Sequence, residues 1–379
     1  MKLRSHTILF AIASLACASH FSTALAAENN HAYARFPALH RDTVVFTAEG
    51  DLWKTSTQGG IAQRLTTHPG AETQASISRD GQWIAFSATY EGAQEAYVMP
   101  IQGGIPQRIS FENSQVNVLG WTAQGEVLMS AQNQTGPAAQ AIIFKVQPSS
   151  LQRTVFPVVD ANEATLDDNG KFLYFTRLGS HVRGDNVKQY RGGAVAQLWR
   201  FDLTSGDQKN AEAIRLFAQD KANHRRAMLW KNRLIFLSDR DGAMNLYSAN
   251  LDGSDPRKLT QGREWDVRNP QLSEGKIIYQ SGADMRLYDL NKQQDQLLSV
   301  SLVSDFDQSR QRYIKNPLEF LSNVQPASKD EKIVVTARGH LTVAGNNSHR
   351  RIDITLPNGA NAGARARDAV FSHDDKFIY

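Results

Sequence analysis

Basic and aromatic side chains gather in two short stretches of the 379-residue sequence: the glycine-containing stretch 179–196 has the character of a loop at the mouth of a channel, and the basic cluster 224–226 could line a channel and bind a carboxylate. An arginine guanidinium donates two parallel hydrogen bonds to a carboxylate, whereas a lysine acts as a point charge. A solvated loop at 224–226 and a packing extension at 179–196 are the alternative interpretations. The candidate residues are Arg183, Lys188, Tyr190 and Arg191 in the first stretch, and Arg225 and Arg226 in the second.

The sequence lacks the patterns that typically carry catalysis or hold a metal. A hydrolase serine at a strand-to-helix elbow would stand in Gly-x-Ser-x-Gly, which does not occur. The ten histidines are scattered, without the His-x-x-x-His spacing of many zinc sites. Asp239 to Gly242 resembles the start of a calcium loop but lacks the closing glutamate, so we interpret it as a turn. We expect no catalytic residue, no metal and no cofactor in residues 1–379.

The composition is that of an ordinary globular protein, with 41% hydrophobic and 21% charged residues. Its formal charge is +4, and two of the basic residues, Lys2 and Arg4, lie in a segment that we expect to be removed. The remaining chain would be nearly neutral. We therefore expect neither nucleic acid nor an anionic membrane surface as a partner.

Residues 1–26 have the pattern of a secretory signal peptide. A basic start precedes the apolar stretch Thr7 to Ala18, and Ala24-Leu25-Ala26 is a small-x-small cleavage site. The apolar stretch is short for a membrane span, although a retained anchor is an alternative. Removal would also take away Cys17, the single cysteine, and leave no disulfide. We expect a periplasmic or secreted protein without a membrane span after signal removal.

The candidate ligand residues must be positioned by a repeated β element, which is the dominant pattern of the chain. A short apolar strand recurs every 40 to 46 residues, except for one gap of 61 residues that contains the stretch 179–196. Short strands with glycine or aspartate turns at this period are typical of β-propeller blades, whereas immunoglobulin-like repeats are about 100 residues long. We therefore predict an all-β fold with six blades. The copies are Thr43–Thr47, Trp83–Ser87, Val127–Ser130, Phe172–Thr176, Leu234–Ser238 and Lys276–Gln280.

The repeat also predicts the domain organisation. A six-bladed propeller would occupy residues 31–303, and the polar stretch 304–321 would be a linker. The strand pattern then starts again, so residues 322–379 would be the beginning of a second propeller. The sequence stops at Tyr379 inside an apolar strand, which indicates the front part of a longer protein.

The chain resembles the tricorn protease homologues, a family of large serine peptidases. The similarity runs from about Tyr33 to Tyr379, and an insertion inside one blade together with a restart after six blades is its most specific part. The motifs that carry it are Arg35-Phe36-Pro37, Asp51-Leu52-Trp53, Tyr190-Arg191-Gly192-Gly193, Leu198-Trp199-Arg200, Ser238 to Gly242, Asn245-Leu246-Tyr247 and Thr336 to Gly339.

The resemblance implies that the second propeller has seven blades and is truncated here. It implies catalytic residues in later domains, beside a PDZ-like domain, with oligopeptide substrates and a homo-oligomer. The propellers would form the channels for peptide entry or product exit. Archaeal family members are cytosolic, which gives a cytoplasmic location as the alternative. In the prototype an arginine pair between the second and third blades anchors the peptide C-terminus, but residues 111–120 here contain no arginine or lysine.

We therefore predict the non-catalytic propeller part of a tricorn-like serine peptidase that degrades oligopeptides. One alternative is a periplasmic TolB-like propeller that acts as a protein-protein interaction scaffold. That protein would carry a small α/β domain before its blades, whereas blades begin here soon after residue 26. A second alternative is the propeller of a prolyl-oligopeptidase-like hydrolase, which would continue into an α/β-hydrolase domain.

Overall fold

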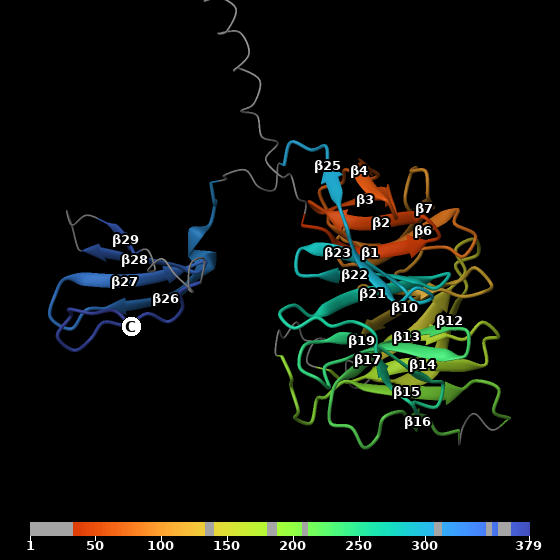
Figure 1. Ribbon diagram of the computed structural model, residues 1–379. Helices are drawn as coiled ribbons and strands as arrows, with labels where there is room; N and C mark the ends of the chain where they lie inside the picture. The colour runs from red at the N-terminus through yellow and green to blue at the C-terminus, as the bar shows by residue number, and fades with distance from the viewer. Residues whose placement is uncertain are drawn as a thin grey trace, which may run out of the picture. The chain divides into compact units, whose positions relative to one another are not determined.

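The computed structural model divides the chain into two compact units, residues 1–307 and residues 308–379 (Figure 1). It describes residues 33–132, 140–179, 188–206, 211–306, 313–345, 351–354 and 365–379. The predicted signal peptide 1–26, Arg183 and part of the predicted linker lie outside the described residues.

The described part of the first unit consists of antiparallel sheets that follow one another along the chain. The first two are β1 (Arg35–His40), β2 (Thr43–Ala48), β3 (Asp51–Ser56), β4 (Gly59–Arg64), and β5 (Glu72–Ile77), β6 (Trp83–Ala88), β7 (Glu95–Pro100), β8 (Gln107–Arg108). The next two are β9 (Asn117–Trp121), β10 (Val127–Gln132), β11 (Ala141–Val146), β12 (Arg153–Val159), and β13 (Ala161–Leu166), β14 (Phe172–Arg177), β15 (Gln197–Asp202), β16 (Ile214–Arg215). The last two are β17 (His224–Trp230), β18 (Arg233–Ser238), β19 (Asn245–Asn250), β20 (Arg257–Lys258), and β21 (Val267–Ser273), β22 (Lys276–Ser281), β23 (Asp284–Asp289), β24 (Gln294–Leu298). We number these sheets as blades 1 to 6.

The first strands of the six blades form a closed circle. In the described residues β1 packs against β5, and the contacts continue from β5 to β9, β13, β17 and β21. β21 packs against β1 again, which closes the ring. This arrangement confirms the predicted all-β propeller, and each repeated apolar segment of the sequence is the second strand of a blade.

Apolar side chains fill the space between neighbouring blades. Phe46 and Trp53 of blade 1 share a core with Ile278 and Leu287 of blade 6, and all four are buried. Full burial of one such side chain contributes roughly 1.5–3 kcal/mol. Because every blade has two neighbours in the ring, this packing holds the fold together in a chain whose single cysteine lies at position 17.

A short strand after blade 6 links the end of the ring to its beginning. β25 (Val300–Leu302) pairs in parallel with β4, the outer strand of blade 1 (Figure 1). The Gly60 amide donates to the Ser299 carbonyl at 2.9 Å. Gly59 has φ +76°, and a β-carbon there would collide with the same carbonyl oxygen. Glycine is therefore required at position 59 for the closing strand to approach β4.

The recurring Leu-Thr and Ile-Ser pairs at the ends of blades have a common role. In each case the hydroxyl oxygen accepts a hydrogen bond from the backbone amide of the third strand of the same blade. Such a bond satisfies a buried donor where the short fourth strand has ended. The pairs are Leu52 N to Thr66 Oγ1 (2.8 Å), Ala96 N to Ser110 Oγ (2.8 Å) and Leu246 N to Thr260 Oγ1 (3.0 Å).

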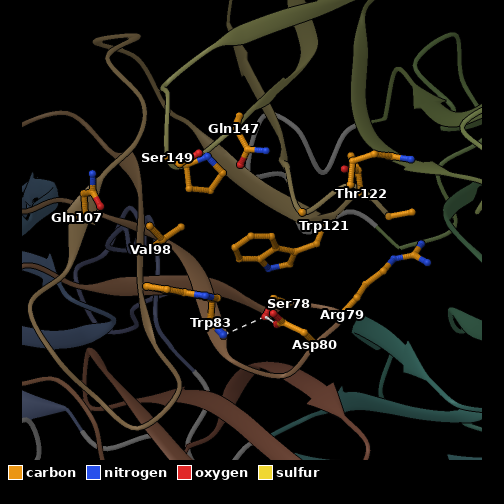
Figure 2. Close-up of a pocket in the computed structure, with 14 residues that line it drawn as sticks. Ser78, Arg79, Asp80, Trp83, Val98, Gln107, Trp121, Thr122, Gln147 and Ser149 are labelled. Carbon is orange, nitrogen blue, oxygen red and sulfur yellow. Dashed lines mark hydrogen bonds between the residues drawn. The ribbon is translucent and has the colours of Figure 1, made fainter.

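The Ser-x-Asp-Gly turn between the first and second strands of blade 2 is held in a similar way. The Trp83 amide donates to Ser78 Oγ at 2.9 Å, and the Ser78 hydroxyl donates to Asp80 (Figure 2). The second unit has the same serine contacts in the turn Ser372 to Asp375, where an aspartate stands in place of the glycine, and the Phe377 amide donates to Ser372 Oγ at 3.0 Å. The two units thus use the same local chemistry.

The second unit contains one described sheet, β26 (Leu321–Pro326), β27 (Lys332–Ala337), β28 (His340–Gly345) and β29 (Ile352–Ile354). A 3-10 helix, η3 (Pro317–Phe320), precedes it. The predicted linker 304–321 therefore contains structured residues: Phe306 packs against the core of the first unit and Leu321 starts β26. Within the described residues, every helix is too short or too polar to cross a bilayer.

Candidate functional site

The strands within each blade are antiparallel, so the loops that connect them lie at two ends of the ring. Turns between second and third strands, and the connections between blades, lie at one end. The stretch 188–196 joins β14 to β15 and so belongs to this end, which we call the insertion end. Turns between first and second strands and between third and fourth strands lie at the opposite end.

Every innermost strand carries a β-bulge close to the insertion end. A bulge bends the strand and re-aims the extra side chain. Because the six strands surround the ring axis, the six bulges lie around the axis at one level, and we call this part of the ring the axial constriction. The bulges lie between Arg35 and Ala38, Thr73 and Ser76, Val118 and Gly120, Ala161 and Glu163, Arg225 and Met228, and Arg268 and Gln271.

Four of these bulges hold a non-glycine residue in the left-handed conformation. Phe36, Gln74, Arg226 and Asn269 have φ values of 49°, 52°, 54° and 48°. Each such residue costs roughly 1–3 kcal/mol, and such strain concentrates at functional sites. These four residues lie on inner strands around the ring axis, at the same level of the ring.

A polar cavity of about 210 Å³ lies at these bulges. Its lining comes from the second to sixth blades, and amide side chains are the largest group among the lining residues. Gln74 Nε2 donates to Asn117 Oδ1 at 2.9 Å. The other oxygen of this pair, Gln74 Oε1, is buried and has no partner among the described residues. The lining residues that lie on the inner strands and carry amide or charged side chains are Gln74, Asn117, Asn162, Glu163, Arg225, Arg226 and Asn269.

Arg225 and Arg226 share one carboxylate at the edge of this cavity. Arg226 Nε donates to Glu163 Oε1 at 3.0 Å, Arg226 N donates to Glu163 Oε2 at 3.1 Å, and the Arg225 guanidinium pairs with the same carboxylate. Burial lowers the pKa of Arg226 from its ordinary value, while Glu163 opposes this shift. Among the described lining residues, two guanidinium groups accompany one carboxylate, which gives the wall of the cavity a net positive charge.

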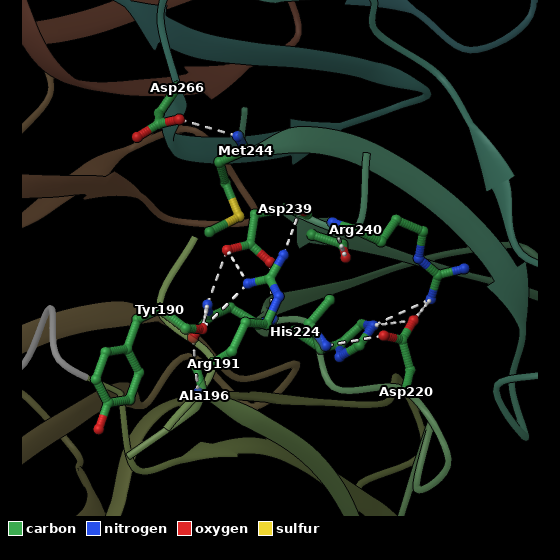
Figure 3. Close-up of polar contacts among 12 residues, drawn as sticks. Tyr190, Arg191, Ala196, Asp220, His224, Asp239, Arg240, Met244 and Asp266 are labelled. Carbon is green, nitrogen blue, oxygen red and sulfur yellow. Dashed lines mark hydrogen bonds and ion pairs between the residues drawn. The ribbon is translucent and has the colours of Figure 1, made fainter. Parts of the chain in front are cut away.

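The insertion residues lie at the same end but have partners of their own (Figure 3). Arg191 forms an ion pair with Asp239 at 2.8 Å and donates to the Asp239 carbonyl at 3.0 Å. Lys188 Nζ donates to the Glu264 carbonyl at 2.9 Å. Tyr190 is half-buried and its carbonyl accepts from Asn223 Nδ2 at 3.1 Å. The structure therefore places Arg225 and Arg226 at the cavity, and Lys188, Tyr190 and Arg191 in contacts between loops.

His224, which precedes the two arginines, is a buried core residue. Its ring stacks on Phe217 with centroids 4.6 Å apart, and Nε2 lies 3.0 Å from Arg240 Nη2 and 3.4 Å from Asp220 Oδ2. Burial lowers the pKa of His224 to about 4, with Asp220 opposing the shift. A neutral His224 accepts the Arg240 hydrogen bond, and this holds the start of β17 in place (Figure 3).

Sequence reasoning missed Glu163 and the amide residues of the cavity, because isolated Asn and Gln residues give no local signal. One signal was available for two of the bulges. Pro37 and Pro270 directly follow Phe36 and Asn269. Proline lacks the amide that a central strand needs, so a proline inside an inner strand indicates a bulge.

A closed ring of four-stranded sheets with a polar constriction on its axis defines the class of the first unit as a six-bladed β-propeller. Comparison with known proteins gives the family. The chain belongs to the family of the Tricorn protease N-terminal beta propeller domain, whose model matches residues 31–294.

Relatives with curated descriptions agree with this assignment. The chain is 25% identical over 309 residues to a tricorn protease homolog of Saccharolobus solfataricus, covering 81% of this chain and 28% of the relative. It is 28% identical over 312 residues to tricorn protease homolog 1 of Streptomyces coelicolor, with the same two shares of 81% and 28%. The chain thus spans little more than a quarter of the length of these relatives.

The fold is also that of a solved structure. The crystal structure of the tricorn protease superimposes with a TM-score of 0.65 at 18% identity, covering 86% of this chain and 31% of that one. At this identity the likeness shows the shared fold.

Proposed function

We propose that this chain is the non-catalytic propeller part of a tricorn-like serine peptidase, and that its axial constriction guides oligopeptides toward, or products away from, domains later in the same protein. The observation that carries the proposal is the polar cavity formed by bulges of the inner strands, with Arg225 and Arg226 at its edge. The family assignment supplies the peptidase context.

The chemistry of the cavity fits a peptide main chain of varied sequence. Amide side chains both donate and accept hydrogen bonds, so Gln74, Asn117 and Asn269 can pair with peptide groups whatever side chains those carry. The excess guanidinium charge attracts a terminal carboxylate. The constriction admits an extended chain and excludes a folded domain, because β25 links the ends of the ring and limits how far the blades spread.

Two further features belong to this proposal. Assembly into a homo-oligomer would enclose the peptide path. Export with loss of residues 1–26 would leave Ala27 as the first residue, which N-terminal sequencing of protein from the cell envelope or medium checks. Retention of Met1 in a cytoplasmic pool would instead support the alternative location.

The test compares tetra-alanine with a free C-terminal carboxylate and the same peptide as its amide, by calorimetric titration into the whole chain. We expect the free acid to bind roughly tenfold more tightly, the value of one charge-assisted hydrogen bond. The Arg225→Gln variant should bind both peptides equally. Arg257→Gln removes an arginine whose side chain is 70% exposed and serves as the control. Equal binding of acid and amide by the unaltered chain, or hydrolysis of either peptide by it, would contradict the proposal.

A further inference from the structure

A second and larger cavity, of about 580 Å³, lies at the opposite end of the ring between blades 2 and 3. Its walls come from the turn before β6, from β7 and β8, and from the turns that follow β9 and β11. This volume lies within the range of about 300–1,000 Å³ found for small-molecule sites. We call this cavity the inter-blade groove; neither the axial constriction nor the insertion contributes to its lining.

Two indole rings form the apolar part of the inter-blade groove. Figure 2 shows the ring of Trp121 in the middle of the cavity, with Trp83 and Val98 around it. Trp121 Nε1 donates to the Ser76 carbonyl of blade 2 at 3.0 Å, which fixes the ring across the gap between the blades. With its N–H already used, Trp121 presents only a ring surface. Trp83 is 45% exposed although its backbone is held by Ser78.

The two charged groups of the groove lining have partners, and its amide side chains have free hydrogen-bonding capacity. Arg79 is paired with Asp168 at 2.7 Å, and the nearby Asp80 is the second charged group of the lining. The amides of Gln107, Gln124 and Gln147 line the cavity, and no hydrogen bond to these side chains is found among the described residues. Arg79 is balanced by Asp168, and Asp80 accepts hydrogen bonds from the Ser78 hydroxyl and the Gln82 amide, so neither charge is left without a partner for a ligand to meet.

Two indole surfaces, of which the Trp121 ring is fixed by its hydrogen bond, match an extended, uncharged peptide segment together with the uncommitted amides around them. Proline and aromatic side chains pack on indole faces, and grooves lined by aromatic residues take proline-containing segments in the extended polyproline conformation. The glutamine amides would pair with the peptide carbonyl and N–H groups that such packing leaves at the rim. A rigid platform binds with little loss of its own conformational freedom.

We propose that the inter-blade groove is a peptide-docking site for uncharged segments that contain proline next to an aromatic residue. This site deepens the proposed function, because it would hold a substrate segment at the end of the ring opposite the guanidinium groups. The groove depends on the proposed function only for the role that peptide binding would have there. The binding itself depends on Trp83, Trp121 and the three glutamines, all of which lie away from the axial cavity.

The probe is the pentapeptide Gly-Pro-Phe-Pro-Gly, acetylated at its N-terminus and amidated at its C-terminus, titrated calorimetrically into the whole chain. Because both ends are capped, the probe has no carboxylate for Arg225 or Arg226. We expect saturable binding at one site, weakened roughly tenfold by Trp83→Ala through loss of the aromatic contact. Arg225→Gln should leave it unchanged, which separates failure of this site from failure of the channel.

Trp265→Ala is the matched control, since Trp265 is also an exposed tryptophan, at 62%, but lies at the insertion end. Gln147→Ala provides a second variant in case Trp83→Ala unfolds, and it should weaken binding several-fold. Three results would overturn the proposal: no saturable binding of the probe, equal loss in the Trp265 and Trp83 variants, or binding of the neutral sugar maltotriose with higher affinity than the peptide.

Discussion

Arg191 and Asp239 form an ion pair of 2.8 Å that joins the insertion of blade 4 to the turn between β18 and β19 of blade 5. The same carboxylate accepts from Asn223 N and from Asn223 Nδ2, both at 2.8 Å. Asn223 directly precedes β17, the strand that carries Arg225 and Arg226. The insertion thus supports the cavity indirectly, by fixing the strand that lines it.

Replacement of Arg191 by alanine should destabilise the first unit by about 1–3 kcal/mol, because buried Asp239 loses its charged partner. Solvent screens part of the attraction between the two charges, because the Arg191 side chain is 36% exposed. Urea unfolding followed by tryptophan fluorescence measures the change. The exposed pair Arg257–Asp255 gives the control, and Arg257→Ala should cost no more than about 0.5 kcal/mol. Equal losses in the two variants would show that Asp239 does not depend on Arg191.

Replacement of Gly59 by alanine should loosen the closure of the ring. Alanine at this position would both adopt an unfavourable φ and collide with the Ser299 carbonyl. Gly60→Ala is a close control, because Gly60 also has positive φ but a β-carbon there meets nothing within 4 Å. Hydrogen exchange in β4 and β25 should rise markedly in the first variant only. Similar exchange in both variants would mean that backbone strain alone, and not the approach of β25, determines the closure.

Glu72 should make the protein less stable as the pH rises. Burial raises the pKa of Glu72 to about 7, against 4.5 for a free side chain, while Tyr90 and Thr66 donate to its oxygens. The folded state therefore holds a proton that the unfolded state releases between these values. The protonated Glu72 side chain contributes on the order of 3 kcal/mol to the free energy of unfolding. This contribution is complete below pH 4.5 and is lost as the pH rises through 7. Glu72→Gln should remove this slope in unfolding free energies measured from pH 4 to pH 8.

His224 should act in the opposite direction. Its pKa is lowered to about 4 from 6.5, because burial disfavours the charged ring. In the unfolded state His224 binds a proton below pH 6.5, whereas in the folded state it stays neutral down to about pH 4. The free energy of unfolding therefore falls as the pH falls from 6.5 to 4. The two slopes overlap and partly cancel in the unaltered chain. His224→Gln should therefore leave a profile dominated by Glu72, and an unchanged profile would show that His224 is not neutral in the fold.

The strands of the propeller were predictable because each blade repeats the same local chemistry. The Asp-Gly turns, the apolar second strands and the Leu-Thr pairs are patterns within about 45 residues, and the structure uses each of them. The turn interpretation of Asp239 to Gly242 agrees with its place between β18 and β19. Local pattern was thus sufficient for the blades and their order.

The site depended on contacts between residues far apart in the sequence. The sequence singled out Arg225 and Arg226, but their partner Glu163 is separated from them by 62 and 63 positions. Trp83 and Trp121 come together only because blades 2 and 3 are neighbours in the ring. The parallel pairing of β25 with β4 joins the two ends of the propeller, and no motif in either strand indicates it. Such features follow from closure of the ring and not from any single repeat.

The central claim is that a peptide occupies the axial constriction, and photo-crosslinking tests it most directly. A tetrapeptide with a free C-terminal carboxylate and a benzophenone side chain is irradiated with the whole chain, and the labelled residues are located by mass spectrometry. We expect saturable labelling of Gln74, Asn117 and Asn269, and strong reduction of it by Arg225→Gln. Labelling confined to the outer strands of the blades, or unaffected by excess unlabelled tetrapeptide, would contradict the claim.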